Sequence, residues 1–338
     1  MSVSSVAALV VVVAFAFVLG VSDAPNASAA VIASRAASYR QAMAFSFVTH
    51  ALGGLLAGQA VALTMTTVVH VPAPELPGTY LAGGVAALVF TLLLTRRGVP
   101  VSASIALVGG LAGAAAVDVG LGAVGWGGLR GIHPYGVAGT LLAIVVSPIL
   151  GGLVAAGLRR ARGRVLHRAS RDVMRSLKAT IWVSAGLVGL ADGSNDGQKA
   201  MGLATALLVA SGSIRSFAVP LWVSAVVALA LAAGTAAGGR RIVRTVSSRF
   251  YRGGPLDGVA AQSASAVAIL GAAWLGAPVS TSTVVASSMI GAGAARRRRH
   301  VHWPTVRRVI SAWAFTLPAS AALGACLVEI GRLSGALP

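Results

Sequence analysis

The chain has 338 residues, of which 56% are hydrophobic and 10% are charged, and its mean hydropathy of +0.83 excludes an ordinary soluble domain. Its formal net charge of +19 is high enough for a nucleic-acid-binding protein, but the basic residues are confined to short segments between apolar runs. We therefore interpret the chain as an integral membrane protein whose positive charge marks its topology, with the lipid bilayer and not nucleic acid as its partner.

Apolar runs follow one another along the whole chain, separated by charged or by Pro- and Gly-rich breaks. A helix needs roughly 20 apolar residues to span the hydrocarbon core. The first run has no Lys or Arg before it, so we expect it to be a retained crossing and not a cleaved signal peptide. The pattern predicts crossings at about residues 3–34, 41–69, 80–95, 98–117, 136–158, 179–210, 217–238, 255–276, 277–295 and 305–333.

The basic segments follow every second predicted crossing, so they gather on one side of the membrane. By the positive-inside rule that side is the cytoplasm. This predicts a multi-pass protein of the cell inner (plasma) membrane with both termini extracytoplasmic. The basic segments lie at 35–40, 96–97, 159–178, 240–252 and 296–308.

Each half of the chain holds five predicted crossings, an odd number, so the second half runs through the membrane in the reverse sense. Residues 100–104 (Pro-Val-Ser-Ala-Ser) also align with residues 278–282 (Pro-Val-Ser-Thr-Ser). We predict an all-α polytopic membrane protein with two inverted-topology repeats and discontinuous or re-entrant helices, as in secondary transporters. The predicted division is 1–158 for the first repeat, 159–178 for a basic cytoplasmic linker and 179–338 for the second repeat.

Two ionisable, glycine-containing clusters lie inside apolar runs, at residues 20–26 and 193–199. An Asp or Lys costs about 3 kcal/mol at the centre of a membrane helix, so such residues indicate a functional site. We expect the glycines to break both helices there and the side chains to face a cavity enclosed by protein. The ionisable residues of these clusters are Asp23, Asp196 and Lys199, together with the adjacent Asp192.

The short segments 98–117 and 277–295 open with Pro and are rich in Gly, Ser and Ala, which predicts half-helices. Free amides and the positive dipole end at a helix N-terminus favour an anion, and hydroxyls add donors. The alternative is that these hydroxyls only pack or bond within helices. The predicted anion ligands of this kind are Ser102, Ser104, Ser280, Thr281 and Ser282.

Together, the segments 23–27 (Asp-Ala-Pro-Asn-Ala), 100–104, 193–202 (Gly-Ser-Asn-Asp-Gly-Gln-Lys-Ala-Met-Gly) and 278–282 resemble the duplicated signatures of the inorganic phosphate transporter (Pit) family. The resemblance implies cation-coupled symport of phosphate driven by sodium or protons. In some bacterial members it implies sulfate or a metal–phosphate complex as the substrate. Where bacterial members commonly carry histidine, this chain has Ile105, Thr283 and Asp192, which puts a histidine-based proton relay in doubt.

Physical roles also follow from residue type. Asp23 and Asp196 are hard oxygen donors suited to a sodium ion or to proton uptake. Asp192 either adds a carboxylate to cation coupling or caps part of its helix. Lys199 either neutralises the anion or pairs permanently with an aspartate. His50 is expected to be an interhelical hydrogen-bonding group. The neutral donors predicted to bind phosphate are Asn26, Asn195, Gln198 and the hydroxyls above.

The function predicted is therefore secondary active transport of inorganic phosphate together with a coupling cation, Na⁺ or H⁺, and with no cofactor. Sulfate or another tetrahedral oxyanion is the alternative substrate. A passive channel is disfavoured because inverted repeats fit alternating access. An enzyme is disfavoured because the sequence shows neither a metal-ligand His spacing nor a nucleophile and base pair. The oligomeric state, monomer or homo-oligomer, stays open.

Overall fold

The computed structural model describes residues 2–97, 101–165, 171–238, 255–296 and 303–335. Nearly all regular structure in these residues is helical. A short antiparallel hairpin, β1 (Gly128–Arg130) and β2 (His133–Tyr135), precedes the last helix of the first half. The helices of the first half are α1 (Val3–Ala33), α2 (Tyr39–Leu55), α3 (Ala60–Thr66), α4 (Leu76–Arg96), α5 (Ala103–Asp118), the 3₁₀ turn η1 (Leu121–Ala123) and α6 (Gly136–Val165). Those of the second half are α7 (Arg171–Ala210), α8 (Leu221–Ala237), α10 (Pro255–Trp274), α11 (Thr281–Arg296) and α12 (Trp303–Leu333).

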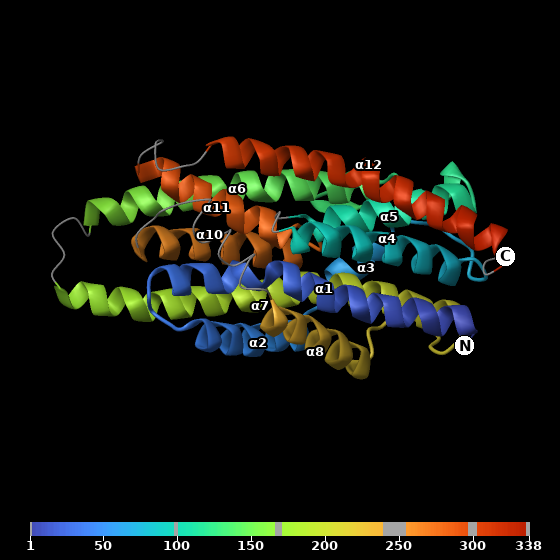
Figure 1. Ribbon diagram of the computed structural model, residues 1–338, viewed down its shortest axis with the longest axis horizontal. Coiled ribbons are helices and arrows are strands. Elements are labelled where there is room, and N and C mark those ends of the chain that lie inside the picture. Colours follow the sequence, from blue (N-terminus) through green and yellow to red (C-terminus); the bar gives the residue numbers. More distant parts are fainter. Residues whose placement is uncertain (1, 98–100, 166–170, 239–254, 297–302, 336–338) are drawn as a thin grey trace.

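The two halves pack on each other in a reciprocal way. Helix α1 packs on α8 and α2 packs on α7, while α5 packs on α12 and α11 packs on α6. Each of these contacts has a counterpart with the halves exchanged. Figure 1 shows α1 and α7 running in opposite directions, and α6 and α12 also, with both termini at the same end. The predicted fold of two inverted repeats is therefore confirmed.

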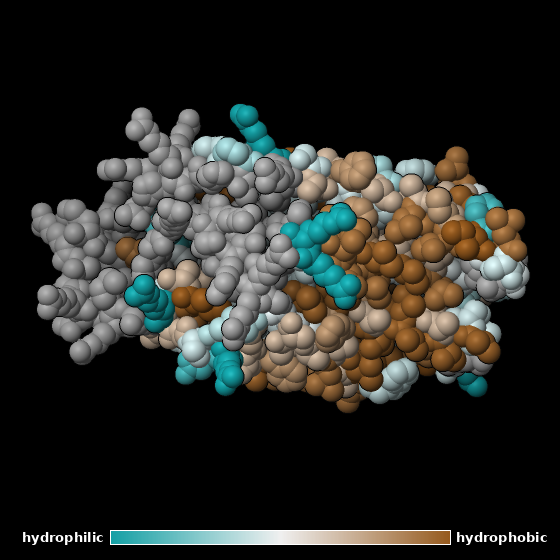
Figure 2. Space-filling view, viewed as in Figure 1, coloured by the Kyte–Doolittle hydropathy of each residue, from teal (hydrophilic) through white to brown (hydrophobic). Residues whose placement is uncertain are grey.

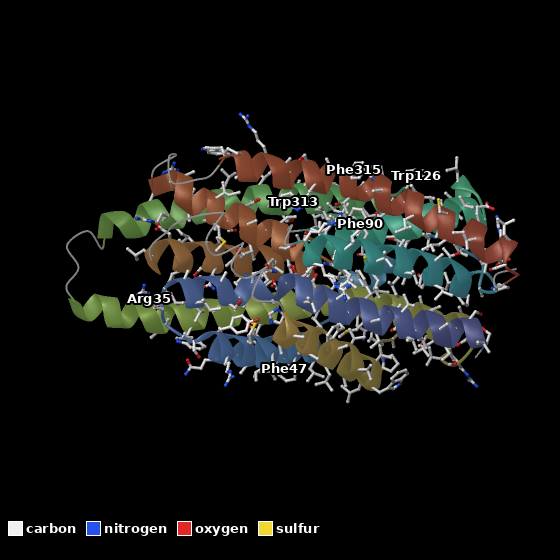
Figure 3. The ribbon with its side chains drawn as sticks, viewed as in Figure 1. Arg35, Phe47, Phe90, Trp126, Trp313 and Phe315 are labelled. Atoms are coloured by element: carbon white, nitrogen blue, oxygen red, sulfur yellow. The ribbon has the colours of Figure 1, made fainter. Side chains whose placement is uncertain are left out.

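Long apolar helices form the outside of the molecule. By length and composition, five helices of the described residues can cross a membrane, or six if the bent pair α2 and α3 counts as one span. Figure 2 shows a broad apolar surface over the half of the molecule that carries the termini. Exposed aromatic residues, among them Trp126 and Phe315, belong to this outer surface (Figure 3). The chain is a multi-pass membrane protein.

Helices α1 and α7 are continuous, so the predicted unwinding at Asp23 and Asp196 is wrong. The glycines of α7 serve close packing instead. A Cβ atom on Gly193 would lie 2.2 Å from the carbonyl oxygen of His50, so only glycine lets α2 approach α7 this closely. The backbone is interrupted elsewhere, between α2 and α3, which are bent by 74°, and in the extended residues before α5 and α11.

The predicted basic linker 159–178 is partly helical, because α6 extends to Val165 and α7 begins at Arg171. Residues 166–170 lie outside the described residues, as do Pro100, the basic segment 240–252 and residues 297–302 of the last basic segment. Arg35 lies at the end of the molecule opposite both termini (Figures 1 and 3).

Candidate functional site

Four helices bring the polar residues of the apolar runs together at one buried place. The middles of α1 and α7 supply the ionisable groups, and the first residues of α5 and α11 supply hydroxyls. Asp23 and Asn26 on α1 are each 3% exposed, while Asp192 and Lys199 on α7 are fully buried. The polar groups of α1 and α7 are thus shielded from solvent by the protein.

Asn26 is the hub of this cluster. Its amide nitrogen Nδ2 lies 3.2 Å from Asp23 Oδ1, 2.9 Å from Asp192 Oδ2 and 3.5 Å from Thr281 Oγ1. Thr281 in turn donates from its hydroxyl to Asp196 Oδ2 at 2.9 Å. One neutral amide therefore bonds to two aspartates directly, reaches the third through Thr281, and connects the two repeats.

Lys199 has its three donors occupied within the protein. Its Nζ donates to Asp196 Oδ1, to the carbonyl oxygen of Val279 and to Ser104 Oγ, the last at 2.7 Å. An ammonium group has three donors, so these bonds satisfy it. Of the two roles that the sequence left open, this conformation shows the pair with Asp196, and it also places the ammonium against the N-terminal end of α5.

The extended residues before α5 and α11 lie side by side and exchange hydrogen bonds. Ser104 Oγ donates to the carbonyl oxygen of Val279 at 3.0 Å, and Ser282 Oγ donates to the carbonyl oxygen of Val101 at 3.2 Å. Asn195 on α7 holds the second extended segment. Its Nδ2 donates to the carbonyl of Ala277 at 3.0 Å, and its Oδ1 accepts from the Val279 amide at 3.2 Å.

Two other predicted ligands bond to the backbone instead of facing the cluster. Ser102 caps α5, and its hydroxyl accepts from the Ile105 amide at 3.3 Å. Gln198 Oε1 accepts from the Val61 amide at 2.9 Å, which ties α7 to the start of α3. Ser280 is buried at the start of α11, and its carbonyl accepts from Thr283 Oγ1.

The cluster holds more negative than positive charge. Three aspartates face one lysine, so the site has an excess of two negative charges when all four groups are ionised and His50 is neutral. Removing charges from water costs several kcal/mol per ion unless they are paired. The site therefore favours cations. Among the described residues no group of three or more His, Cys, Asp or Glu is arranged to hold a metal ion, so a cation held here needs amide, hydroxyl or carbonyl oxygens as well.

His50 is a member of the site that sequence reasoning left outside it. It lies on α2, is fully buried, and its Nε2 is 3.8 Å from Asp192 Oδ2. Its Nδ1 bonds to the carbonyl oxygen of Ser46 at 2.8 Å. In the sequence His50 is a lone histidine in an apolar run, and only the packing of α2 on α7 reveals its neighbour.

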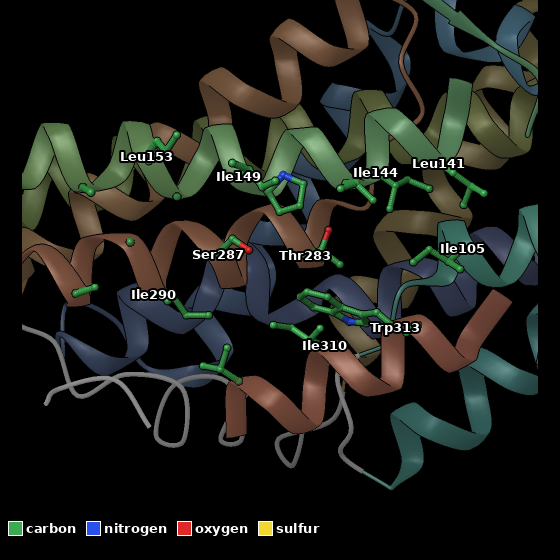
Figure 4. A pocket seen from close by; sticks show the side chains of 18 of the residues that line it. Ile105, Leu141, Ile144, Ile149, Leu153, Thr283, Ser287, Ile290, Ile310 and Trp313 are labelled. Carbon is green, nitrogen blue, oxygen red and sulfur yellow. The ribbon is translucent and has the colours of Figure 1, made fainter. Parts of the chain in front are cut away.

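A large cavity lies behind the site, between α6, α11 and α12, with a volume of about 840 Å³ (Figure 4). Its walls are mostly apolar, so it does not suit phosphate. Ile105 and Thr283, which stand where histidines are common in the resembling family, both line this cavity and do not face the charged cluster.

The chain matches known phosphate transporters over nearly its whole length. The model of the phosphate transporter family matches residues 19–182 and again residues 160–324, once for each repeat. A Rhizobium meliloti (strain 1021) protein named "Probable low-affinity inorganic phosphate transporter" is 34% identical over 92% of this chain and 91% of its own. A Bacillus subtilis (strain 168) protein of the same name is 32% identical over 92% of each chain. A solved structure, "The sodium-dependent phosphate transporter", has the same fold, with a TM-score of 0.86 and 22% identity over 98% of this chain and 100% of its own. This chain therefore belongs to the phosphate transporter family.

Proposed function

We propose that this member of the phosphate transporter family carries inorganic phosphate across the membrane by symport with a cation, sodium or a proton. The observation that supports the proposal most directly is the buried cluster on α1 and α7, with its three carboxylates and one ammonium, beside the N-terminal ends of α5 and α11. Such a site repels a lone anion and accepts an anion together with cations.

The order of binding follows from charge. With two excess negative charges the cluster first needs a cation, and Asp23 and Asp196 are the carboxylates that we propose for it. Asp23 accepts a hydrogen bond from Asn26 at Oδ1, and its carboxylate has further oxygen lone pairs that can accept a sodium ion or a proton. Asp192 serves the same coupling through its bond to Asn26.

The anion would then bind where donors from both repeats converge. Ser104 and Thr281 lie at the N-terminal ends of α5 and α11, where free helix amides add a positive potential. The ammonium of Lys199 on α7 bonds to Ser104 at the same place. These donors now bond to protein oxygens, so binding requires them to turn from those partners to phosphate oxygens. Asn26, Asn195, Ser280 and Ser282 complete the proposed neutral set, while Ser102 and Gln198 support the adjacent backbone.

Alternating access follows from the reciprocal packing of the halves. The cluster is buried in this conformation, which suits an occluded state, and the inverted repeats offer two related arrangements that open to opposite sides. A passive channel would instead need a continuous polar path through the membrane.

We infer that the end of the molecule carrying Arg35 faces the cytoplasm and that both termini face outward, as the positive-inside rule requires. The free Cys326 is first replaced by serine, and single cysteines are then placed at Ser38 and Ser334. In intact cells an impermeant thiol reagent should label position 334 and spare position 38. The reverse pattern would overturn the inferred orientation.

Radiolabelled phosphate uptake into proteoliposomes tests the proposed function. We expect saturable uptake that rises with an inward gradient of sodium or protons and that falls when unlabelled phosphate competes. Competition by sulfate at equal strength would instead assign a broader oxyanion substrate. Uptake that grows linearly with phosphate concentration and ignores both gradients would contradict symport.

A further inference from the structure

We propose that His50 and Asp192 form the binding site for a transported proton, so that proton symport in this chain depends on a histidine from α2. The inference rests on the proposed symport function and specifies its cation.

The hydrogen bonds of His50 define the state of its ring. Nδ1 lies 2.8 Å from the carbonyl oxygen of Ser46, and a carbonyl oxygen can only accept, so Nδ1 carries a proton. The neutral ring therefore presents the lone pair of Nε2 to Asp192, whose Oδ2 is 3.8 Å away. Both atoms are acceptors, so no hydrogen bond can join them until a proton is added. Protonation of Nε2 turns this contact into an ion pair.

Unused hydrogen-bonding capacity marks the same place. Within the described part of the chain, His50 Nε2 and Asp192 Oδ1 are both buried and have no hydrogen-bond partner. Unpaired polar atoms are costly inside a membrane protein, and buried ionisable groups there mark proton or ion pathways. One proton on Nε2 gives the nitrogen a donor directed towards the carboxylate.

The surrounding charges favour an added proton. The charged groups that act on Asp192 are Asp196 on α7, which is paired with Lys199, and Asp23 on α1, while the hydrogen-bond partners Asn26 and Ser46 are neutral. Without the pair, two carboxylates and one ammonium remain, so the environment is negative overall. A protonated His50 removes one unit of the negative excess.

Close packing fixes the pair in place. A Cβ on Gly189 would lie 2.1 Å from Thr49 Oγ1, and one on Gly53 would lie 2.3 Å from the Leu190 carbonyl oxygen. These glycines hold α2 against α7, which belong to opposite repeats. Asn26 then links Asp192 to Thr281 at the proposed phosphate site through two hydrogen bonds. Proton binding at the pair is thus connected to the anion site by a single side chain.

The test measures the steady-state ratio of phosphate inside to outside proteoliposomes in sodium-free buffer with an acidic exterior. This ratio depends on coupling and not on how many molecules are active. A gradient of one pH unit is worth about 1.4 kcal/mol per proton, which corresponds to about tenfold accumulation of phosphate per coupled proton. With such a gradient we expect about tenfold accumulation per coupled proton for the wild type and for His70→Gln, since His70 is exposed. For His50→Gln and Asp192→Asn we expect a ratio close to one.

The outcomes separate the two proposals. Wild-type accumulation with a sodium gradient but not with a pH gradient would overturn the proton site and keep symport, whereas no accumulation with either would remove symport itself. Full pH-driven accumulation in His50→Gln would show that the coupled proton binds elsewhere or that the gradient acts through phosphate ionisation, and either result would overturn the site. If both single variants fail to admit phosphate, the exchanged variant His50→Asp with Asp192→His decides: restored accumulation supports the pair, and none contradicts it.

Discussion

Ser104 and Ser282 make the same hydrogen bond from opposite repeats. Ser104 donates to the carbonyl of Val279 and Ser282 donates to the carbonyl of Val101, and both serines close the repeated Pro-Val-Ser motif. Val101 and Val279 occupy the same position in the two motifs, so exchanging the two halves converts one hydrogen bond into the other. The approximate twofold axis of the molecule therefore passes between the two extended segments, next to the cluster on α1 and α7.

Replacing Ser104 with alanine should weaken phosphate binding. Its hydroxyl is in contact with the Lys199 ammonium and is placed to donate to the anion. A hydrogen bond to a charged group contributes about 1.5–3 kcal/mol, so the dissociation constant should rise about 10- to 150-fold. Calorimetric titration of the purified variant checks this. The matched control Ser213→Ala alters an exposed hydroxyl and should bind as the wild type does, and equal affinity in both variants would place the anion elsewhere.

Asp23→Asn and Asp196→Asn should each abolish gradient-driven uptake. Each aspartate is the fourth residue of its cluster, 20–26 or 193–199, so the two align between the repeats, and an amide cannot neutralise a cation as a carboxylate does. Uptake under imposed gradients is compared with that of Glu329→Gln, whose side chain is 57% exposed near the end of α12. Wild-type uptake in both aspartate variants would remove these carboxylates from the mechanism.

Lys199→Met should destabilise the fold, because it leaves the Asp196 carboxylate buried without its ammonium partner. Breaking a buried pair in this way costs about 3–5 kcal/mol. Adding Asp196→Asn removes the orphaned charge, so the double variant should regain much of the lost thermal stability. Unfolding curves in detergent measure this recovery. A double variant no more stable than Lys199→Met would show that the pair is not the cause.

Gly193→Ala should disrupt transport by forcing α2 away from α7. The added methyl carbon would lie 2.2 Å from the His50 carbonyl oxygen, a distance that backbone atoms do not tolerate. We expect reduced uptake together with lower stability. Gly157→Ala is the matched control, because a Cβ atom at Gly157 on α6 meets no atom within 4 Å. Uptake at the wild-type rate in Gly193→Ala would argue against a fixed spacing between the two helices.

Local patterns predicted much of the fold and less of the site. Proline followed by small residues at 100–104 and 278–282 predicts the short helices correctly, because proline and serine restrict the backbone only over the next few residues. The bend between α2 and α3 was missed inside one apolar run. The glycines of α7 predict a break in the helix, whereas in the structure they mediate helix packing, which depends on residues far away in the sequence. The contact of His50 with Asp192 spans the two repeats, so no local pattern could show it.

Accumulation of phosphate against its own concentration gradient is the most direct measurement of coupled transport through the cluster on α1 and α7. Proteoliposomes with the wild-type protein receive inward sodium and proton gradients of increasing size, and internal phosphate is read at steady state. We expect the ratio of inside to outside phosphate to rise with the gradient and to fall to one when an ionophore dissipates it. A ratio that stays at one while the gradients persist, with phosphate still entering, would contradict symport.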